Sequence, residues 1–139
     1  MTKEDKELIL KDISGRLVYN VKCHIPETNE VKILGAIQED GENTLFDFWE
    51  DDSKKQYQYQ LYISEFKPYL FPLSSMTNEQ KREFLFLHSE KQQEAGHSNL
   101  EIIIEPCRLK IDWLDKNHFD YRDLIPKGLA NDATGLNIY

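Results

Sequence analysis

The sequence predicts an α+β fold: a small open five-stranded antiparallel β-barrel, of the Src-homology-3 or Sm kind, with an N-terminal helix and C-terminal helices packed on it. Apolar residues recur at helical spacing near the N-terminus, alternate with a period of two over residues 17–63, and return to helical spacing after residue 77. With 139 residues, 40% apolar and 30% charged, the chain fits one globular domain. We expect a helix at 1–15, the barrel at 17–73, a helical and strand half at 77–130 and a tail at 131–139.

The first predicted helix begins with Thr2 and Asp5, which have the spacing of a loose capping box. Leu8, Ile9 and Ile13 then recur on one face, and Gly15 is a natural stop. The segment therefore reads as a short amphipathic helix.

Alternation predicts four strands, at 17–25, 31–37, 45–49 and 56–63, which turns such as Asp40-Gly41 join into a meander. In the first strand the same interior is expected to hold Leu17, Tyr19, Val21, Cys23 and Ile25, with Lys22 and His24 outward. Residues of one face also alternate in the other three strands. These sets are Val31, Ile33, Gly35 and Ile37; then Phe46 and Phe48; then Tyr57, Tyr59, Leu61 and Ile63.

A fifth strand is predicted at 67–73, after one helical turn at 64–66. Pro68 and Pro72 each remove a hydrogen-bond donor, so this strand is expected at an edge or at bulges. The barrel rests on this strand count and spacing.

The second half predicts helices with one strand between them. Thr77 to Gln80 fits a capping box that opens a helix running towards Gly96, and 100–104 reads as a short apolar strand. Pro106 is expected in the first turn of a further helix, and a last short helix is expected at 121–125. The tail offers few apolar anchors.

Charge, hydropathy and cysteine content bear on the expected partners and location of the protein. The formal net charge is −8, and the lysines and arginines are scattered, so nucleic-acid binding is disfavoured and a charged partner is expected to be basic. No apolar run is long enough for a membrane span and no secretion signal is visible, so a cytoplasmic location is expected. Cys23 and Cys107 are then expected to be reduced core thiols.

Two segments carry a family resemblance. "FKPYLFPLSSMT" (66–77) and "DWLDKNHFDYRDLIPKGLA" (112–130) resemble a family of small uncharacterised proteins from gut Bacteroidetes and their phages. The resemblance implies a phage or mobile-element context and no particular reaction. The chain departs from that family in two places: Asp123 stands where the family usually has glycine, and the tail ends in "GLNIY" rather than in a Pro-Glu-Gly run. The resemblance therefore implies that Asp123 is a tolerated helix residue and that the tail is a variable surface.

The best catalytic candidates are His118 and Asp120, a potential general base with its orienting carboxylate. No serine or cysteine nucleophile is recognisable, so a structural role for these residues is favoured. No histidine spacing typical of a metal site occurs. The nearest approaches to metal ligands are His88, Glu90, Glu94 and His97 on one segment, and the turn at 38–43, which reads better as a hairpin than as a calcium loop.

Aromatic residues gather on the predicted third and fourth strands. Trp49, Tyr57, Tyr59 and Tyr62 are the candidate binding residues, although filling the core is the favoured role for most of the rings.

Three hypotheses follow from the sequence. The first is a non-enzymatic interaction module with an unknown protein partner and no cofactor, metal or membrane. The second is an Sm-like barrel that acts with nucleic acid in a larger complex. The third is a small hydrolase or nuclease centred on His118 and Asp120. The oligomeric state stays open at this point.

Overall fold

A computed structural model describes residues 1–50, 57–87 and 99–139 and confirms a mixed α+β fold with helices at both ends of the sequence. The sheet, however, is open and has seven strands, so the five-stranded barrel is wrong. The helical elements are α1 (Lys3–Arg16), η1 (Leu17–Tyr19), η2 (Ile63–Glu65), η3 (Leu73–Ser75), α2 (Asn78–Leu85) and α3 (Asn99–Lys116). The strands are β1 (Lys22–Ile25), β2 (Glu30–Asp40), β3 (Asn43–Trp49), β4 (Tyr57–Leu61), β5 (Lys67–Pro72), β6 (Phe119–Asp120) and β7 (Asn131–Asp132).

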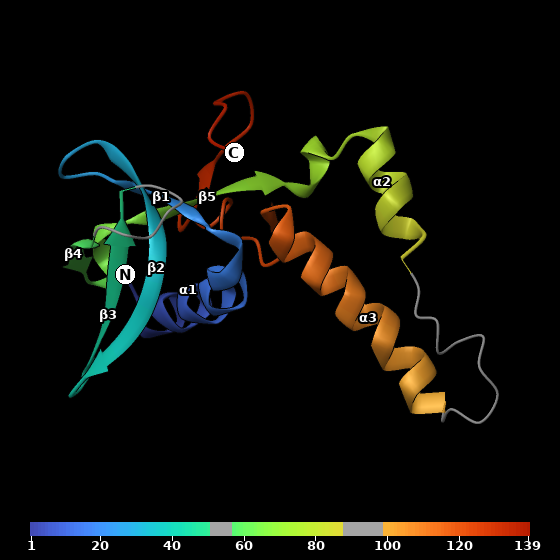
Figure 1. Ribbon diagram of the computed structural model, residues 1–139, viewed down its shortest axis with the longest axis horizontal. Helices are drawn as coiled ribbons and strands as arrows, with labels where there is room; N and C mark the ends of the chain where they lie inside the picture. Colours follow the sequence, from blue (N-terminus) through green and yellow to red (C-terminus); the bar gives the residue numbers. More distant parts are fainter. Residues whose placement is uncertain (51–56, 88–98) are drawn as a thin grey trace.

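The predicted meander is confirmed, because β1 to β4 pair in sequence order and antiparallel. The sheet order is β4-β3-β2-β1-β5-β6, and β7 also pairs with β5. Strands β1 to β5 are labelled in Figure 1. β5 therefore lies inside the sheet, and its expected edge position is wrong. Its prolines are tolerated because each pairing of β5 spans only two residues.

The register of β2 differs from the prediction because of an irregularity between Leu34 and Ala36. Before it, Ile33 of the predicted set is 4% exposed, but Val31 is 40% exposed and Leu34, outside that set, is fully buried. The Trp49 side chain occupies the space where a side chain at Gly35 would stand. A glycine is thus required for the close approach, and the alternation changes face at this point.

α1 begins with the predicted capping box, in which Thr2 Oγ1 accepts from Asp5 N at 3.1 Å. The helix does not stop at Gly15. Instead, Gly15 lets α3 approach, since a Cβ there would lie 3.0 Å from Asp115 Oδ2.

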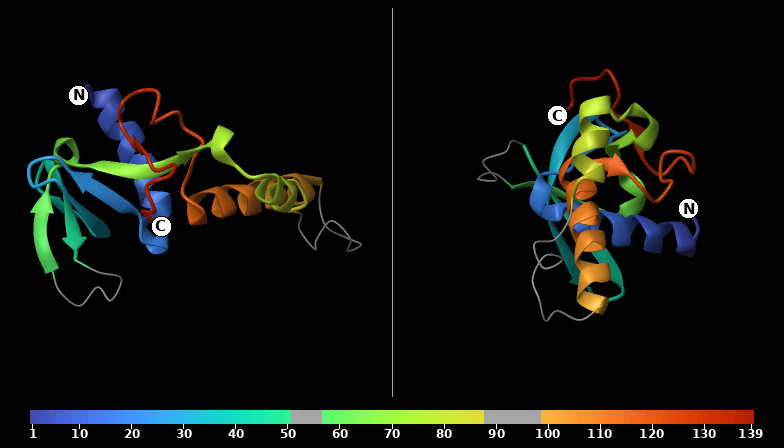
Figure 2. Two further views of the ribbon diagram at one scale, coloured as in Figure 1. Left: turned by 90° about the horizontal axis from the view of Figure 1, so that it is seen from above. Right: turned by 90° about the vertical axis from the view of Figure 1, so that its right-hand side faces the viewer.

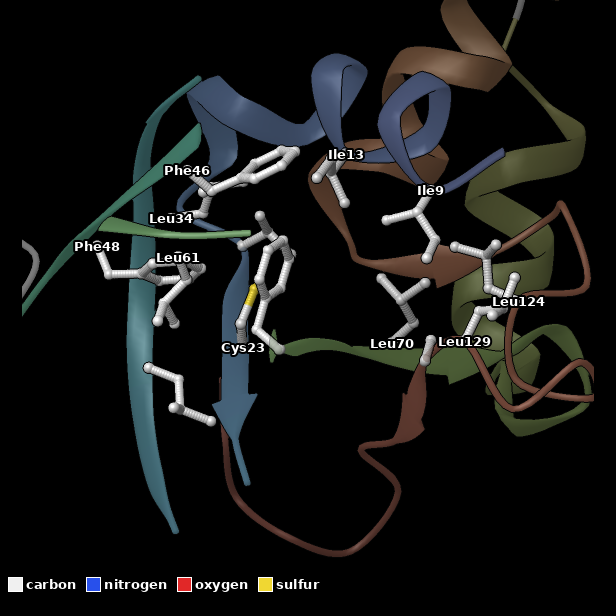
Figure 3. Close-up of a cluster of buried hydrophobic side chains, with 14 residues drawn as sticks. Ile9, Ile13, Cys23, Leu34, Phe46, Phe48, Leu61, Leu70, Leu124 and Leu129 are labelled. Carbon is white, nitrogen blue, oxygen red and sulfur yellow. The ribbon is translucent and has the colours of Figure 1, made fainter. Parts of the chain in front are cut away.

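The core lies between α1 and the sheet (Figure 3). Ile9 and Ile13 of α1 face Cys23, Leu34 and Leu70 of the strands, all at 1% exposure or less. Phe46 and Phe48 are both buried, as predicted, and each packs edge-on against Phe66 at 5.0 Å between ring centres.

The predicted inward set of the first strand is confirmed for Val21, Cys23 and Ile25, which are all buried. Lys22 and His24 are half-buried on the opposite face. Leu17 and Tyr19 belong to η1 rather than to a strand, because the chain turns at Asn20, whose φ is +55°.

The second half contains the largest errors of prediction. The segment 100–104 is helical rather than a strand, and Pro106 lies inside α3 instead of in its first turn. The isoleucine run has a high strand propensity, but the apolar residues of the whole 18-residue segment have helical spacing, and the segment forms a helix. The α2 capping box is confirmed, but α2 ends at Leu85, and the rest of the helix expected towards Gly96 falls outside the described residues.

No helix forms at 121–125; turns follow β6 instead. Asp123 has φ +59°, a left-handed conformation that favours glycine, so the expected helical role of this residue is wrong. The tail is also better anchored than expected. Tyr139 Oη accepts from Lys22 N at 2.8 Å and donates to Tyr69 O at 2.9 Å.

α2 and α3 together form an arm that extends away from the sheet (Figure 2). The inner end of the arm is anchored by Trp113, which stacks on Phe119 with 5.6 Å between ring centres and also contacts Phe84. Trp113 Nε1 donates to Glu83 at 3.0 Å, which ties α3 to α2. Throughout the described residues, no helix combines the length and apolar character that a membrane span needs.

The buried position of Val21 gives a direct test of the β1 register. We expect Val21→Asp to lower the free energy of unfolding by about 3–5 kcal/mol, as for a buried charge without a partner. Val18→Asp is the matched control, because Val18 is 74% exposed and should change stability little. Urea denaturation measures both, and equal effects of the two substitutions would show that the register is wrong.

Candidate functional site

The first candidate site surrounds Asp120, at the end of β6. Its carboxylate accepts from the backbone amides of Arg122, Leu124 and Ile125 at 3.2, 3.0 and 2.9 Å. These bonds hold the turn that follows the strand. Asp120 forms no hydrogen bond with His118 in the described structure, so the expected pair of base and orienting carboxylate is not assembled.

His118 lies just after α3, with φ +61° and 8% exposure. Its ring stacks on Tyr139 with 3.6 Å between ring centres, and its Nδ1 has no hydrogen-bond partner. Burial, with smaller contributions from Arg16 and Lys22, lowers the pKa of His118 to about 4. At neutral pH the imidazole is therefore uncharged and enclosed, and in this arrangement its role is packing.

The most connected polar group is one that the sequence analysis missed: the fully buried Arg16. Its guanidinium donates to both oxygens of Asp12, at 2.8 and 3.0 Å, and to Phe119 O at 2.6 Å. Asp115 of α3 lies 3.8 Å away. The i, i+4 spacing of Asp12 and Arg16 could have suggested a helix ion pair, but not its burial.

Tyr121 completes this buried cluster. Its hydroxyl donates to Asp115 Oδ1 at 2.7 Å, and its ring lies 5.2 Å from the Arg16 guanidinium carbon. Burial raises the pKa of Asp115, which the Tyr121 hydrogen bond and Arg16 partly offset. Burial and the hydrogen bond to Asp115 raise the pKa of Tyr121 to about 12. Arg122 supplies a second cation, 3.5 Å from Asp12, so two arginines lie against two carboxylates, which indicates a structural network.

The residues that the structure describes contain no group of three or more histidine, cysteine or acidic side chains placed to hold a metal ion. His88, Glu90, Glu94 and His97 lie outside those residues. The turn at 38–43 is the hairpin between β2 and β3, as expected.

Both cysteines are free. Cys23 is buried as predicted, but Cys107 is exposed, so its expected core position is wrong.

The four aromatic residues predicted to form a binding face do not form one continuous surface among the described side chains. Trp49 packs over Gly35, and the side chains of Tyr57 and Tyr59 lie outside the described part of the chain. Tyr62 is 50% exposed and lines a cleft of about 600 Å³ beside α1 and β3. Two lysines, Lys3 and Lys6, and two glutamates also line the cleft, so it offers no single charge to a ligand.

The most unusual surface is a line of apolar side chains along α3. We call Leu100, Ile103, Ile104, Cys107 and Ile111 the α3 stripe. Leu100, Ile103, Ile104 and Ile111 are 68%, 62%, 58% and 40% exposed, and Cys107 is exposed as well. Four of the five residues follow intervals of 4, 3 and 4, typical of a helix that packs against another helix. The sequence analysis missed this stripe because it assigned 100–104 to a strand.

An apolar groove of about 350 Å³ lies at the inner end of the arm. It is lined by Leu73, Met76, Lys81, Phe84, Leu85 and Leu114. Leu114 follows Ile111 by three residues and continues the spacing of the stripe. The apolar surface of α3 therefore runs from the outer end of the arm to this groove.

The buried Arg16 network predicts a large loss of stability on truncation. Arg16→Met removes the guanidinium that Asp12 and Asp115 share and leaves Asp12 with only the ion pair to Arg122 Nε at 3.5 Å, so we expect a loss of about 3–5 kcal/mol in the free energy of unfolding. Lys11→Met, on an exposed position of the same helix, is the control and should change stability little. Adding Asp12→Leu to Arg16→Met should recover part of the loss, because it removes a buried carboxylate that has lost both of its hydrogen bonds from Arg16. Chemical denaturation of the four proteins measures these differences.

The lowered pKa of His118 predicts acid sensitivity. The unfolded chain takes up the proton near pH 6.5 and the folded chain only near pH 4, so the stabilisation from neutral His118 is complete above pH 6.5 and is lost as the pH falls to about 4. We expect a contribution of up to ~3 kcal/mol over that window. His118→Asn, which tolerates a positive φ, should flatten the plot of stability against pH there. Identical slopes in the two proteins would contradict this assignment.

Comparisons of the chain with protein-family models, curated proteins and solved structures found no match. The function is therefore argued from the geometry of the chain's own surface.

Proposed function

We propose that this protein is a non-enzymatic interaction module of the cytoplasm, which docks a protein partner through the α3 stripe. The phage or mobile-element context that the two sequence motifs suggest belongs to the same proposal. The single observation that carries it is the exposure of the five apolar side chains of the α3 stripe, on a helix that projects from the sheet (Figure 2). Contiguous exposed apolar surface on a folded domain is typical of an interaction site.

The polar clusters support a binding role over a catalytic one. Asp120 is engaged by three backbone amides, Arg16 is held by hydrogen bonds to Asp12, and Asp115 accepts a hydrogen bond from Tyr121. His118 is enclosed by its stacking on Tyr139. His118 and Asp120, the catalytic candidates of the sequence analysis, thus have structural roles in this fold.

The arm is suited to binding because its two ends differ in packing. The inner end is fixed by Trp113 and Leu114, which are 8% and 6% exposed. The outer end carries Leu100, Ile103 and Ile104, all more than half exposed. A partner would therefore meet a helix that is already positioned, which reduces the entropy lost on binding.

Affinity capture from a host lysate tests this function. The wild-type chain is compared with an Ile103→Asp/Ile104→Asp variant, and with Val18→Asp as a control that places a charge on an exposed apolar residue away from the stripe. We expect at least one protein to be retained by the wild type and by Val18→Asp and lost from the double variant. Retention of the same proteins by all three chains would contradict docking through the stripe.

A further inference from the structure

We propose that the α3 stripe binds the α3 stripe of a second copy of this chain, with the two helices antiparallel. This inference rests on the proposed function, because it names the partner of the same surface. It is carried by three observations: the spacing of the stripe, the position of α3 relative to the sheet, and the charges beside the stripe.

The spacing selects a helix as the partner. Leu100, Ile104, Cys107 and Ile111 follow the 4-3-4 intervals of a coiled-coil seam, and Ile103 lies beside the seam. When two copies run antiparallel, Leu100 of each meets Ile111 of the other, and Ile104 of each meets Cys107 of the other. Every seam residue then lies opposite a seam residue, so the surface is self-complementary, as a two-fold symmetric interface requires.

The direction follows from the shape of the molecule. The C-terminal end of α3 joins the sheet, whereas its N-terminal end lies at the far end of the arm (Figures 1 and 2). Parallel helices would bring two sheets, each in a chain of net charge −8, to the same end of the pair. Antiparallel helices place the two sheets at opposite ends, which lowers steric conflict and charge repulsion.

The charges beside the seam favour the same direction. Glu101 and Arg108 each follow a seam residue by one position, and in an antiparallel pair such equivalent flanking positions face each other. Glu101 of each copy thus lies near Arg108 of the other. Arg108 is held along the helix surface by Glu105 at 2.5 Å and by Asp112 at 3.2 Å. Parallel helices would instead place Arg108 beside Ile103 of the second copy.

Cysteine cross-linking tests the pairing and its direction. In a Cys107→Ser background, we compare the double variant Leu100→Cys/Ile111→Cys with each single variant under mild oxidation. The antiparallel pair predicts a covalent dimer from the double variant and little from either single variant. Residues 100 and 111 are about 16 Å apart along one helix, too far for a disulfide within a chain or between identical positions of the pair. Cys23 stays buried in all three proteins.

Two outcomes would overturn the proposal. Dimers from both single variants would show parallel helices, because identical positions would then meet. Absence of covalent dimer in all three proteins would show that the stripe does not pair with itself.

Sedimentation equilibrium of the unmodified chain gives an independent measurement. An interface of one helix per copy is small, so concentrations up to ~1 mM are needed. We expect a concentration-dependent dimer, at least tenfold weakened by Ile104→Asp and unchanged by Val18→Asp. A monomer throughout, combined with stripe-dependent capture of a different protein, would refute self-pairing and leave the proposed function intact. A dimer without any other stripe-dependent protein would support self-pairing and identify a second copy of the chain as the partner of the stripe.

Discussion

The buried guanidinium of Arg16 is the interaction on which the arrangement of this fold depends. It lies at the end of α1, and it reaches Asp12 of its own helix, the carbonyl of Phe119 in β6 and the carboxylate of Asp115 in α3. The N-terminal helix and the segment from Asp115 to Phe119, about 100 residues later, therefore share one charged group. Because a buried cation without partners is very unfavourable, these parts can pack only in the orientation that supplies its acceptors.

The close approach at this point also explains the role of Gly15. Asp115 lies directly against α1, where a Cβ would stand 3.0 Å from its oxygen. The C-terminal end of α3 is thereby fixed against α1, and the stacking of Trp113 on Phe119 extends the contact to β6. The arm has a rigid base, and its outer half continues beyond the core with its apolar face exposed. The surface proposed for binding is thus a consequence of how the interior is assembled.

The sheet stays open for a related reason. β5 pairs with β1 over only two residues and then with β6 and β7, which come from the C-terminal part of the chain. Among the described residues, β5 beyond Pro68 therefore pairs with these two short strands and not with a strand of the meander. Residues after α3 therefore complete the sheet, and the same segment carries Asp120 and His118. This position accounts for the enclosed, structural surroundings of both residues.

The sequence by itself determined the elements whose signals are local. The capping boxes at Thr2 and Thr77, the Asp40-Gly41 turn and the buried faces of β1 and β3 follow from side chains within a few residues of one another. Tertiary structure decided the rest, because the deciding partner lies far away in the chain. Trp49 over Gly35 changes the register of β2, and Asp120 holds the turn at 122–125 that was expected to be helical. Whether an apolar run such as 100–104 is a strand, a buried helix or an exposed stripe depends on which neighbours reach it, and the amino-acid order of the run does not specify them.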